Sequence, residues 1–229
     1  GKTCVATDIY RGNEGNLDYP DISESSIGVI DENSWVVVAR VDAAPLQKTN
    51  KDLSTLDNFR PIQISTTNGG TTWNLLGQAE VNPGTAVAPK IDVVSGQVLF
   101  ADVPLSEMNL PLKDKTYLLL TFADRGRQTN EVYNKSYEHG LVALHIAPTD
   151  QVLTDKGAWS KNAINLKTNM FSKYDPVNYW RFGYQSLKIN TDLKTMSVLN
   201  QIEDTASTTT LFSQNIKLTD IANAYLQLV

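Results

Sequence analysis

The sequence predicts an all-β protein, and three observations lead to this fold class. Short runs rich in Val, Ile, Thr and aromatic residues recur along the whole chain. Clusters of Gly, Asn, Asp and Pro separate these runs, as turns separate strands. Helical periodicity is nearly absent. The 229 residues, 41% of them hydrophobic, suffice for one sizeable core or two small ones. Many short antiparallel strands in one domain, residues 1–229, mean a sandwich, a barrel or a propeller.

The same pattern predicts the individual elements. Residues 125–138 form the most polar stretch and are expected to make a surface excursion between two strands. Residues 218–229 carry a Leu/Ile/Ala stripe behind Thr219 as N-cap, which predicts a terminal helix. A last strand with a frayed tail is the alternative. In chain order, the expected strands are residues 34–42, 60–65, 72–81, 89–94, 96–103, 115–124, 140–147, 184–190, 194–202 and 208–218.

Charge and composition narrow the classes of partner. The net charge is −5 and the pI is near 5.0, which argues against nucleic acid and anionic membranes as partners. No apolar stretch approaches the ~18–20 residues that span a bilayer, and no signal peptide is recognised at Gly1. Cys4 is the single cysteine, so no internal disulfide is expected.

The sequence gives no indication of a metal or a cofactor. His139 and His145 lie six residues apart, with no carboxylate or cysteine at metal-ligand spacing, so no zinc site is expected. Nucleotide-binding and serine-hydrolase fingerprints are missing as well. We therefore expect neither a bound metal nor a cofactor.

The stretch "STTNGGTTW", residues 65–73, predicts a tight hairpin. Asn68 and Gly69 form a favoured turn dipeptide because both tolerate positive φ at little steric cost. The threonines that follow suit an outgoing strand. Trp73 is expected to fold its ring back onto the base of the hairpin.

This hairpin resembles an Asp-box, the Ser-x-Asp-x-Gly-x-Thr-Trp motif of sialidases and related β-propellers. The matching residues are Thr66, Asn68, Gly70, Thr72 and Trp73. Thr replaces Ser and Asn replaces Asp, and both can still make the hydrogen bonds of the turn. The resemblance implies that the hairpin joins the third and fourth strands of a blade and that its role is structural.

Other stretches resemble the same family in the same order. Residues 8–22 resemble the sialidase opening, and residues 35–42 resemble the next strand, which commonly ends in Ala-Arg. Residues 182–204 resemble the closing segment with its nucleophilic tyrosine, and residues 208–221 resemble the final blade strand. At ~40–50 residues per blade, the resemblance implies a propeller of four to five four-stranded blades, or an incomplete version of the six-bladed sialidase propeller.

The resemblance also implies a set of site residues. Tyr184 matches the nucleophile, and Asp42 is the candidate general acid and base. Arg40, Arg181 and Arg125 are the candidates for binding the sugar carboxylate, which a planar guanidinium grips bidentately. Alternatives remain open: Arg40 can instead pair with Asp42 or Asp57, and Tyr184 can be a core residue.

One part of the family pattern is absent. Residues 18–21 read "DYPD" where sialidases carry the first arginine of their carboxylate-binding triad. Arg11 is the nearest substitute, and Asp52 is a second candidate for the general acid and base. This departure puts an ordinary sialidase pocket in doubt.

Two functions follow from the resemblance. The first is a sialidase-like exo-glycosidase that acts on sialylated or related acidic glycans. The alternative is a non-catalytic, lectin-like or adhesin propeller that binds surface glycans or a protein partner. Either function implies a protein of the cell surface or the extracellular space. A homo-oligomer or a partner chain is expected, because the propeller looks short.

Overall fold

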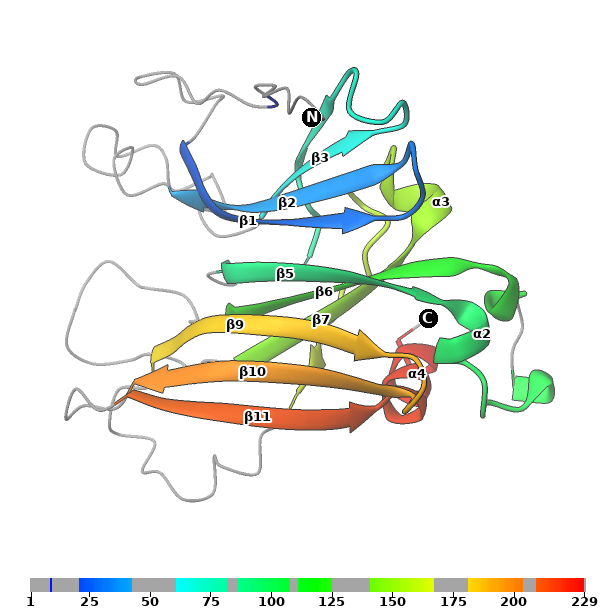
Figure 1. Cartoon of the computed structure of the whole chain (residues 1–229). Coiled ribbons are helices and arrows are strands. Elements are labelled where there is room, and N and C mark those ends of the chain that lie inside the picture. Colours follow the sequence, from blue (N-terminus) through cyan, green and yellow to red (C-terminus); the bar gives the residue numbers. More distant parts are fainter. Residues whose placement is uncertain are drawn as a thin grey trace, which may run out of the picture.

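The computed structural model describes residues 9, 21–42, 61–81, 86–107, 111–124, 141–166, 181–203 and 209–228. The described chain is mostly β-structure, which confirms the all-β class predicted from the sequence. Its strands form three antiparallel sheets, and in each sheet the strands follow one another in chain order (Figure 1). None of the three sheets, as far as the described strands go, closes on itself.

The first sheet contains four strands. They are β1 (Asp21–Val29), β2 (Trp35–Asp42), β3 (Ile62–Thr66) and β4 (Asn74–Gln78). β2 and β3 form a buried centre, with Val36, Val38 and Ile64 fully inaccessible to solvent. The sequence analysis missed β1, because "DISESSIGV" is rich in serine and lacks the dense apolar pattern of the other strands.

The second sheet also contains four strands and carries short helices. Its strands are β5 (Ala86–Ser95), β6 (Thr116–Asp124), β7 (Leu141–Pro148) and β8 (Ile164–Asn165). Between β5 and β6 lie α2 (Gly96–Leu99) and two 3₁₀ turns, η2 (Leu105–Glu107) and η3 (Leu112–Asp114). After β7 comes the single turn α3 (Thr149–Val152).

The strand expected over residues 96–103 is wrong, since α2 begins there. Ser95 caps this helix: its hydroxyl accepts a hydrogen bond from the Val98 N–H. Gly96 packs so closely against backbone that a Cβ would lie 2.2 Å from the carbonyl oxygen of Leu112. The cap and this close approach turn the chain away from the strand direction.

The third sheet has three strands followed by the C-terminal helix. β9 (Arg181–Asn190), β10 (Thr195–Glu203) and β11 (Thr209–Lys217) lie in the order β11-β10-β9. The helix α4 (Leu218–Leu226) follows directly, so of the two alternatives the helix is correct. Its N-cap is Lys217 and not Thr219, because β11 runs to Lys217 and the Leu218 N–H donates to the carbonyl of Lys194.

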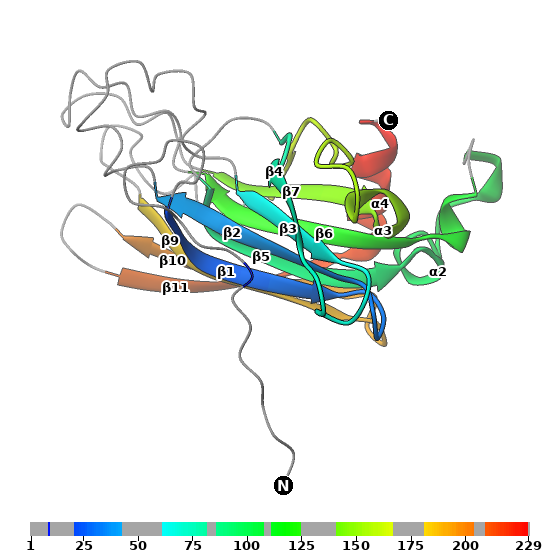
Figure 2. The same cartoon turned by 90° about the horizontal axis from the view of Figure 1, so that it is seen from above.

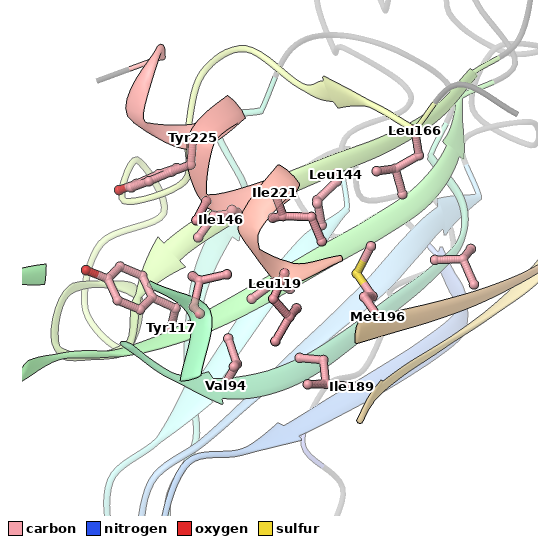
Figure 3. Close-up of a cluster of buried hydrophobic side chains, with 14 of the residues drawn as sticks. Val94, Tyr117, Leu119, Leu144, Ile146, Leu166, Ile189, Met196, Ile221 and Tyr225 are labelled. Carbon is pink, nitrogen blue, oxygen red and sulfur yellow. The ribbon is translucent and has the colours of Figure 1, made fainter. Parts of the chain in front are cut away.

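Two hydrophobic cores hold the layers together. The larger core lies where the second sheet, the third sheet and α4 meet (Figure 3). There Leu119, Leu144 and Ile146 contact Met196 and the apolar side of α4. The second core packs the first sheet on the second and includes Val36, Val38, Leu118, Leu120, Phe122 and Trp159. Burial of these side chains is the main source of stability.

The three sheets are stacked, and their first strands lie side by side. β1 packs beside β5, β5 packs beside β9, and all three run in the same direction (Figure 1). Seen from above, β1, β5 and β9 run across the molecule in the same general direction (Figure 2). Side-chain oxygens join them by accepting backbone N–H groups of the next strand. Ser26 Oγ accepts from Ile91 at 3.2 Å, and Asp92 Oδ2 accepts from Ile189 at 2.8 Å. We call the end of the stack where β1, β5 and β9 begin the strand-start end.

The hairpin between β3 and β4 lies at the opposite end of the first sheet. The Thr66 hydroxyl donates to Asn68 Oδ1 at 3.0 Å and accepts from the Gly70 N–H at 3.1 Å. Asn68 Oδ1 also accepts from the Thr72 N–H at 2.9 Å, and its Nδ2 donates to Thr72 Oγ1 at 2.8 Å. The Trp73 ring packs on the apolar outer side of β2 and β3 and lies 6.0 Å from the Trp35 ring. The side chains of the motif thus form the hydrogen bonds of the turn.

Gly70→Ala is expected to lower the free energy of unfolding by about 1–3 kcal/mol. Gly70 has φ of 82°, which L side chains rarely adopt, and a Cβ there would lie 2.9 Å from the Trp35 ring. Gly69→Ala is the control, since Gly69 has φ of 64° but a Cβ there would lie 3.5 Å from its nearest neighbour, Asn33 Oδ1. Urea unfolding of both variants should show the larger loss for Gly70→Ala, and equal losses would contradict the close contact with Trp35.

No helix in the described part of the chain is long and apolar enough to cross a membrane.

Candidate functional site

Each first strand is interrupted near its beginning. β1 has a bulge between Ser23 and Ser25, and β5 has an irregularity between Val87 and Lys90. In β9 the irregularity lies between Phe182 and Gln185, which pair with Ile202 and Asn200 of β10. Bulges bend a strand, re-aim a side chain and occur often beside active sites. The three first strands therefore carry matching irregularities close to the strand-start end.

Glu24 occupies the bulge of β1 and joins the first two sheets. Its Oε2 accepts from Arg40 Nη1 at 3.1 Å and from the Ala88 N–H at 2.9 Å. The Glu24 side chain is 16% exposed and that of Arg40 is 29% exposed, so the pair is only partly screened by water. Both Glu24 (φ of 42°) and Ala88 (φ of 49°) have positive φ. These two unusual backbone conformations meet at one carboxylate.

The ion pair gives Arg40 a partner that the sequence did not indicate. The structure pairs Arg40 with Glu24, and a pairing with Asp42 or Asp57 stays a prediction. Glu24 lies sixteen residues before Arg40 and on another strand, so no local spacing indicated it. The guanidinium is a fork of five N–H donors, and 29% of the Arg40 side chain is exposed.

The bulge of β9 contains the candidate nucleophile. Asn200 pairs with Gln185 and Ile202 pairs with Phe182, which leaves Gly183 and Tyr184 opposite Gln201 alone. The backbone of Tyr184 thus lies in the third of the matching irregularities. The predicted nucleophile and the predicted carboxylate-binding Arg40 are in this way brought to the same end of the stack.

Buried polar side chains lie directly behind this bulge. Gln185 is 4% exposed, and its Nε2 donates across the sheet boundary to Thr121 Oγ1 at 3.2 Å. Asn200, which is 2% exposed, stands opposite Gln185 in the sheet. Gln185 Oε1 and Asn200 Oδ1 are buried without a hydrogen-bond partner among the described residues, which is costly for amide oxygens. The hydrogen bond from Gln185 to Thr121 joins β9 to β6, and the sequence carried no signal for it.

The remaining candidates lie at strand ends. Asp42 is the last residue of β2 and pairs with Asp21, the first residue of β1. Arg181 is the first residue of β9 and pairs with Glu203. Their backbones therefore lie at the strand-start end with Tyr184. Arg125, together with Arg11, Asp52 and Asp57, lies outside the described residues.

The strand-start end has a mixed charge. Among the described strand ends here, Asp21, Asp42, Asp124 and Glu203 are acidic and Arg181 is basic, and Arg40 lies two residues before the end of β2. Directly opposite residues of an antiparallel pair have Cα atoms about 4.5–5.5 Å apart, so Asp21 and Asp42 are close neighbours. Carboxylates serve in proton transfer during glycoside hydrolysis. They also oppose the capture of an anionic sugar.

A buried histidine lies elsewhere in the second sheet. His145 Nδ1 is 2.6 Å from the Ser160 carbonyl oxygen, and the ring stacks on Phe122 at 5.5 Å. Burial lowers the pKa of His145 to about 4, although the hydrogen bond to Ser160 opposes this shift. His145 is on β7, the third strand of its sheet, and therefore does not lie on a first strand. Its buried contacts give it a structural role. In the part of the chain that is described, no three His, Cys, Asp or Glu residues are grouped to hold a metal ion.

No protein-family model matches the chain, and no curated protein is significantly similar to it. What the residues at the strand-start end can bind or catalyse therefore has to follow from their own chemistry and placement.

Proposed function

We propose that the chain is a glycan-processing protein with a sialidase-like propeller architecture, and that it acts as an exo-glycosidase on a sialylated or related acidic glycan. In a propeller, four-stranded sheets are arranged around a central channel. The three stacked sheets, with their first strands side by side and parallel, support this architecture. The hairpin from Thr66 to Trp73 also supports it, because it connects the third and fourth strands of a sheet.

The observation that carries the proposal is the placement of three residues chosen from the resemblance. Arg40 and Asp42 come from β2, and Tyr184 comes from the bulge of β9, some 140 residues later in the chain. All three lie at the strand-start end. Residues that act on one bound substrate have to lie at the same end of the stack.

Each residue has a role in the proposed reaction. Arg40, held by Glu24, binds the sugar carboxylate through its remaining N–H donors. Tyr184 loses its phenol proton to water as its oxygen attacks the anomeric carbon and the glycosidic bond breaks, and it regains a proton when water later displaces it from the sugar. A tyrosine avoids the repulsion between an anionic sugar and a carboxylate nucleophile. Asp42 donates a proton to the departing glycosidic oxygen and later accepts one from water. Arg181, three residues before Tyr184 in the sequence, adds positive charge at the strand-start end.

A second candidate function is glycan binding without catalysis. Two features favour it: the stretch 18–21 lacks the family's first arginine, and Arg40 is already paired with Glu24. A site with less positive charge holds an acidic sugar more weakly than a sialidase does. Neutral sugars would then be the better ligands.

Turnover of a fluorogenic sialoside separates the two candidates. The wild-type chain is expected to release the fluorophore, and Tyr184→Phe is expected to reduce kcat by a factor of about 10³ or more, as removal of a nucleophile does. Ser186→Ala is the matched control, because Ser186 lies on the same strand and faces solvent. Glycan binding that Arg40→Gln abolishes, without any turnover by the wild type, would indicate the lectin-like function. Neither turnover nor binding would contradict both.

A further inference from the structure

The edges of the three sheets differ in how they are protected. Unpaired strand edges invite another strand, and proteins block them with short strands, bulges, charges or covering elements. β1, β5 and β9 lie beside one another and are joined by side-chain hydrogen bonds. β4 has five residues and an irregular register, and β8 has two residues. The sixth edge belongs to β11.

Among the residues that the structure describes, nothing protects β11 in any of these ways. It pairs with β10 over nine consecutive residues without a register shift. Its sequence, "TTLFSQNIK", contains no proline, and its one charged residue is Lys217 at the very end. Within the described residues, β11 has a hydrogen-bonded neighbour on one side only, and it is the outermost strand of the stack (Figure 1).

The outer face of β11 also exposes apolar surface. Leu211 is 65% exposed, and Leu199 on the neighbouring strand is 42% exposed. Leu199 lies opposite Ser213 and Leu211 lies opposite Gln201, so the two leucines are diagonal neighbours on one face. A strand added beyond β11 would cover part of this patch and would give the third sheet the fourth strand that the other two sheets possess.

We propose that β11 is a dimerisation edge, at which two copies of this chain pair antiparallel through β11 to form one continuous sheet. The charge pattern of β11 is compatible with a second copy as this occupant. With its single charge at one end, β11 can pair antiparallel with itself while the two Lys217 side chains stay at opposite ends. A two-fold arrangement of this kind is self-complementary and closes after two copies.

The register follows from the length of the strand. Pairing all nine residues, Thr209 to Lys217, places the two-fold axis at Ser213. On the outer face Leu211 then lies opposite Asn215 of the second copy, and Ser213 lies opposite its own equivalent. No position brings like charges together, and each copy gains backbone hydrogen bonds along the whole edge.

Sedimentation velocity over a range of concentrations tests the dimer. The wild-type chain is expected to show a species of twice the chain mass, and Ser213→Lys is expected to weaken it by about a hundredfold or more, because two ammonium groups then meet on the axis. Ser186→Lys is the matched control: Ser186, Leu199 and Ser213 form one row across the sheet, and Ser186 is exposed at its far end. A wild type that stays monomeric at every concentration would overturn the proposal, and so would equal weakening by both substitutions.

Cysteine cross-linking tests the register independently. In a Cys4→Ser background, Ser213→Cys is expected to form a disulfide-linked dimer on oxidation, because opposite Cα atoms about 4.5–5.5 Å apart fall in the range of disulfides. Leu211→Cys is expected not to do so, since the two copies of residue 211 would be four residues apart along the strands, roughly 13 Å. Cross-linking by Leu211→Cys but not by Ser213→Cys would overturn the proposed pairing.

Discussion

Trp159→Ala is expected to lower the free energy of unfolding by about 3–5 kcal/mol, the cost typical of removing a buried tryptophan. Trp159 is 2% exposed and is among the largest fully buried side chains. It belongs to the core between the first and second sheets. Its Nε1 donates to Gln63 Oε1 on β3 at 2.8 Å, so the substitution removes both packing and the partner of a buried amide.

Denaturant unfolding followed by circular dichroism measures this loss. Trp159→Phe is the informative companion, since it keeps an aromatic ring but removes the hydrogen bond, and we expect it to cost about 1–3 kcal/mol. Lys161→Ala is the surface control, because Lys161 is exposed in the same loop, and it should stay within about 0.5 kcal/mol of the wild type. A loss for Trp159→Ala as small as that of Lys161→Ala would show that Trp159 does not join the two sheets.

Acidification is expected to destabilise the protein through His145. Its pKa is about 4 in the folded chain and about 6.5 when unfolded. As the pH falls below 6.5, the unfolded state therefore binds a proton at His145 that the folded state does not bind. The stability contributed by neutral His145 is complete at pH 7 and is lost as the pH falls from 6.5 towards 4. The total loss is about 3 kcal/mol.

Comparison with His145→Gln isolates this contribution. Unfolding free energies at pH 7 and pH 4.5 should fall by about 2–3 kcal/mol more for the wild type than for the variant. The variant can be less stable at both values without affecting this difference. Equal pH dependence in the two proteins would mean that His145 titrates normally and is open to solvent.

The sequence was a good guide to the fold class because the strand signal is local. Runs such as residues 115–124 alternate or cluster apolar residues in a way that needs no knowledge of the partner strand. The terminal helix was also visible, since Leu218, Ile221, Ala222 and Tyr225 recur at helical spacing and are the residues that α4 buries. Where the pattern is local, the prediction and the structure agree.

The errors occurred where neighbours decide the conformation. β1 is a serine-rich strand that exists because β2 pairs with it on one side and β5 packs on the other. Gly28 permits that packing, since a Cβ there would lie 2.6 Å from Leu118 Cδ2. Residues 96–103 have strand composition, but a close backbone approach and a serine cap turned their beginning into α2. Tertiary context overrode propensity in both cases.

The propeller of four to five blades stays a prediction, because the described residues form three open sheets. The expectation of four to five rested on ~40–50 residues per blade. The three sheets of the described residues begin at Asp21, Ala86 and Arg181, which are 65 and 95 residues apart by subtraction. Both intervals are longer than the ~40–50 residues of one compact blade.

The glycan site itself stays a prediction, and only part of its surroundings could be anticipated from the sequence. Arg40 and Tyr184 were chosen from a resemblance, and their strands do begin or end at one end of the stack. Glu24 was missed, because its contacts lie 16 residues away in Arg40 and 64 residues away in Ala88. A carboxylate that joins two sheets through a bulge has partners at no regular spacing, so the sequence pattern does not reveal it.

The most direct test of a glycan site at the strand-start end is a titration of the ¹⁵N-labelled protein with a sialylated trisaccharide, followed through its backbone amide shifts. The largest changes are expected at Glu24, Arg40, Ala88 and Tyr184, and the amides of Gly69 and Gly70 at the other end of the first sheet should stay still. Changes confined to the Gly69–Gly70 hairpin, or no change at any amide at the highest glycan concentration, would contradict the assignment of this end as the site.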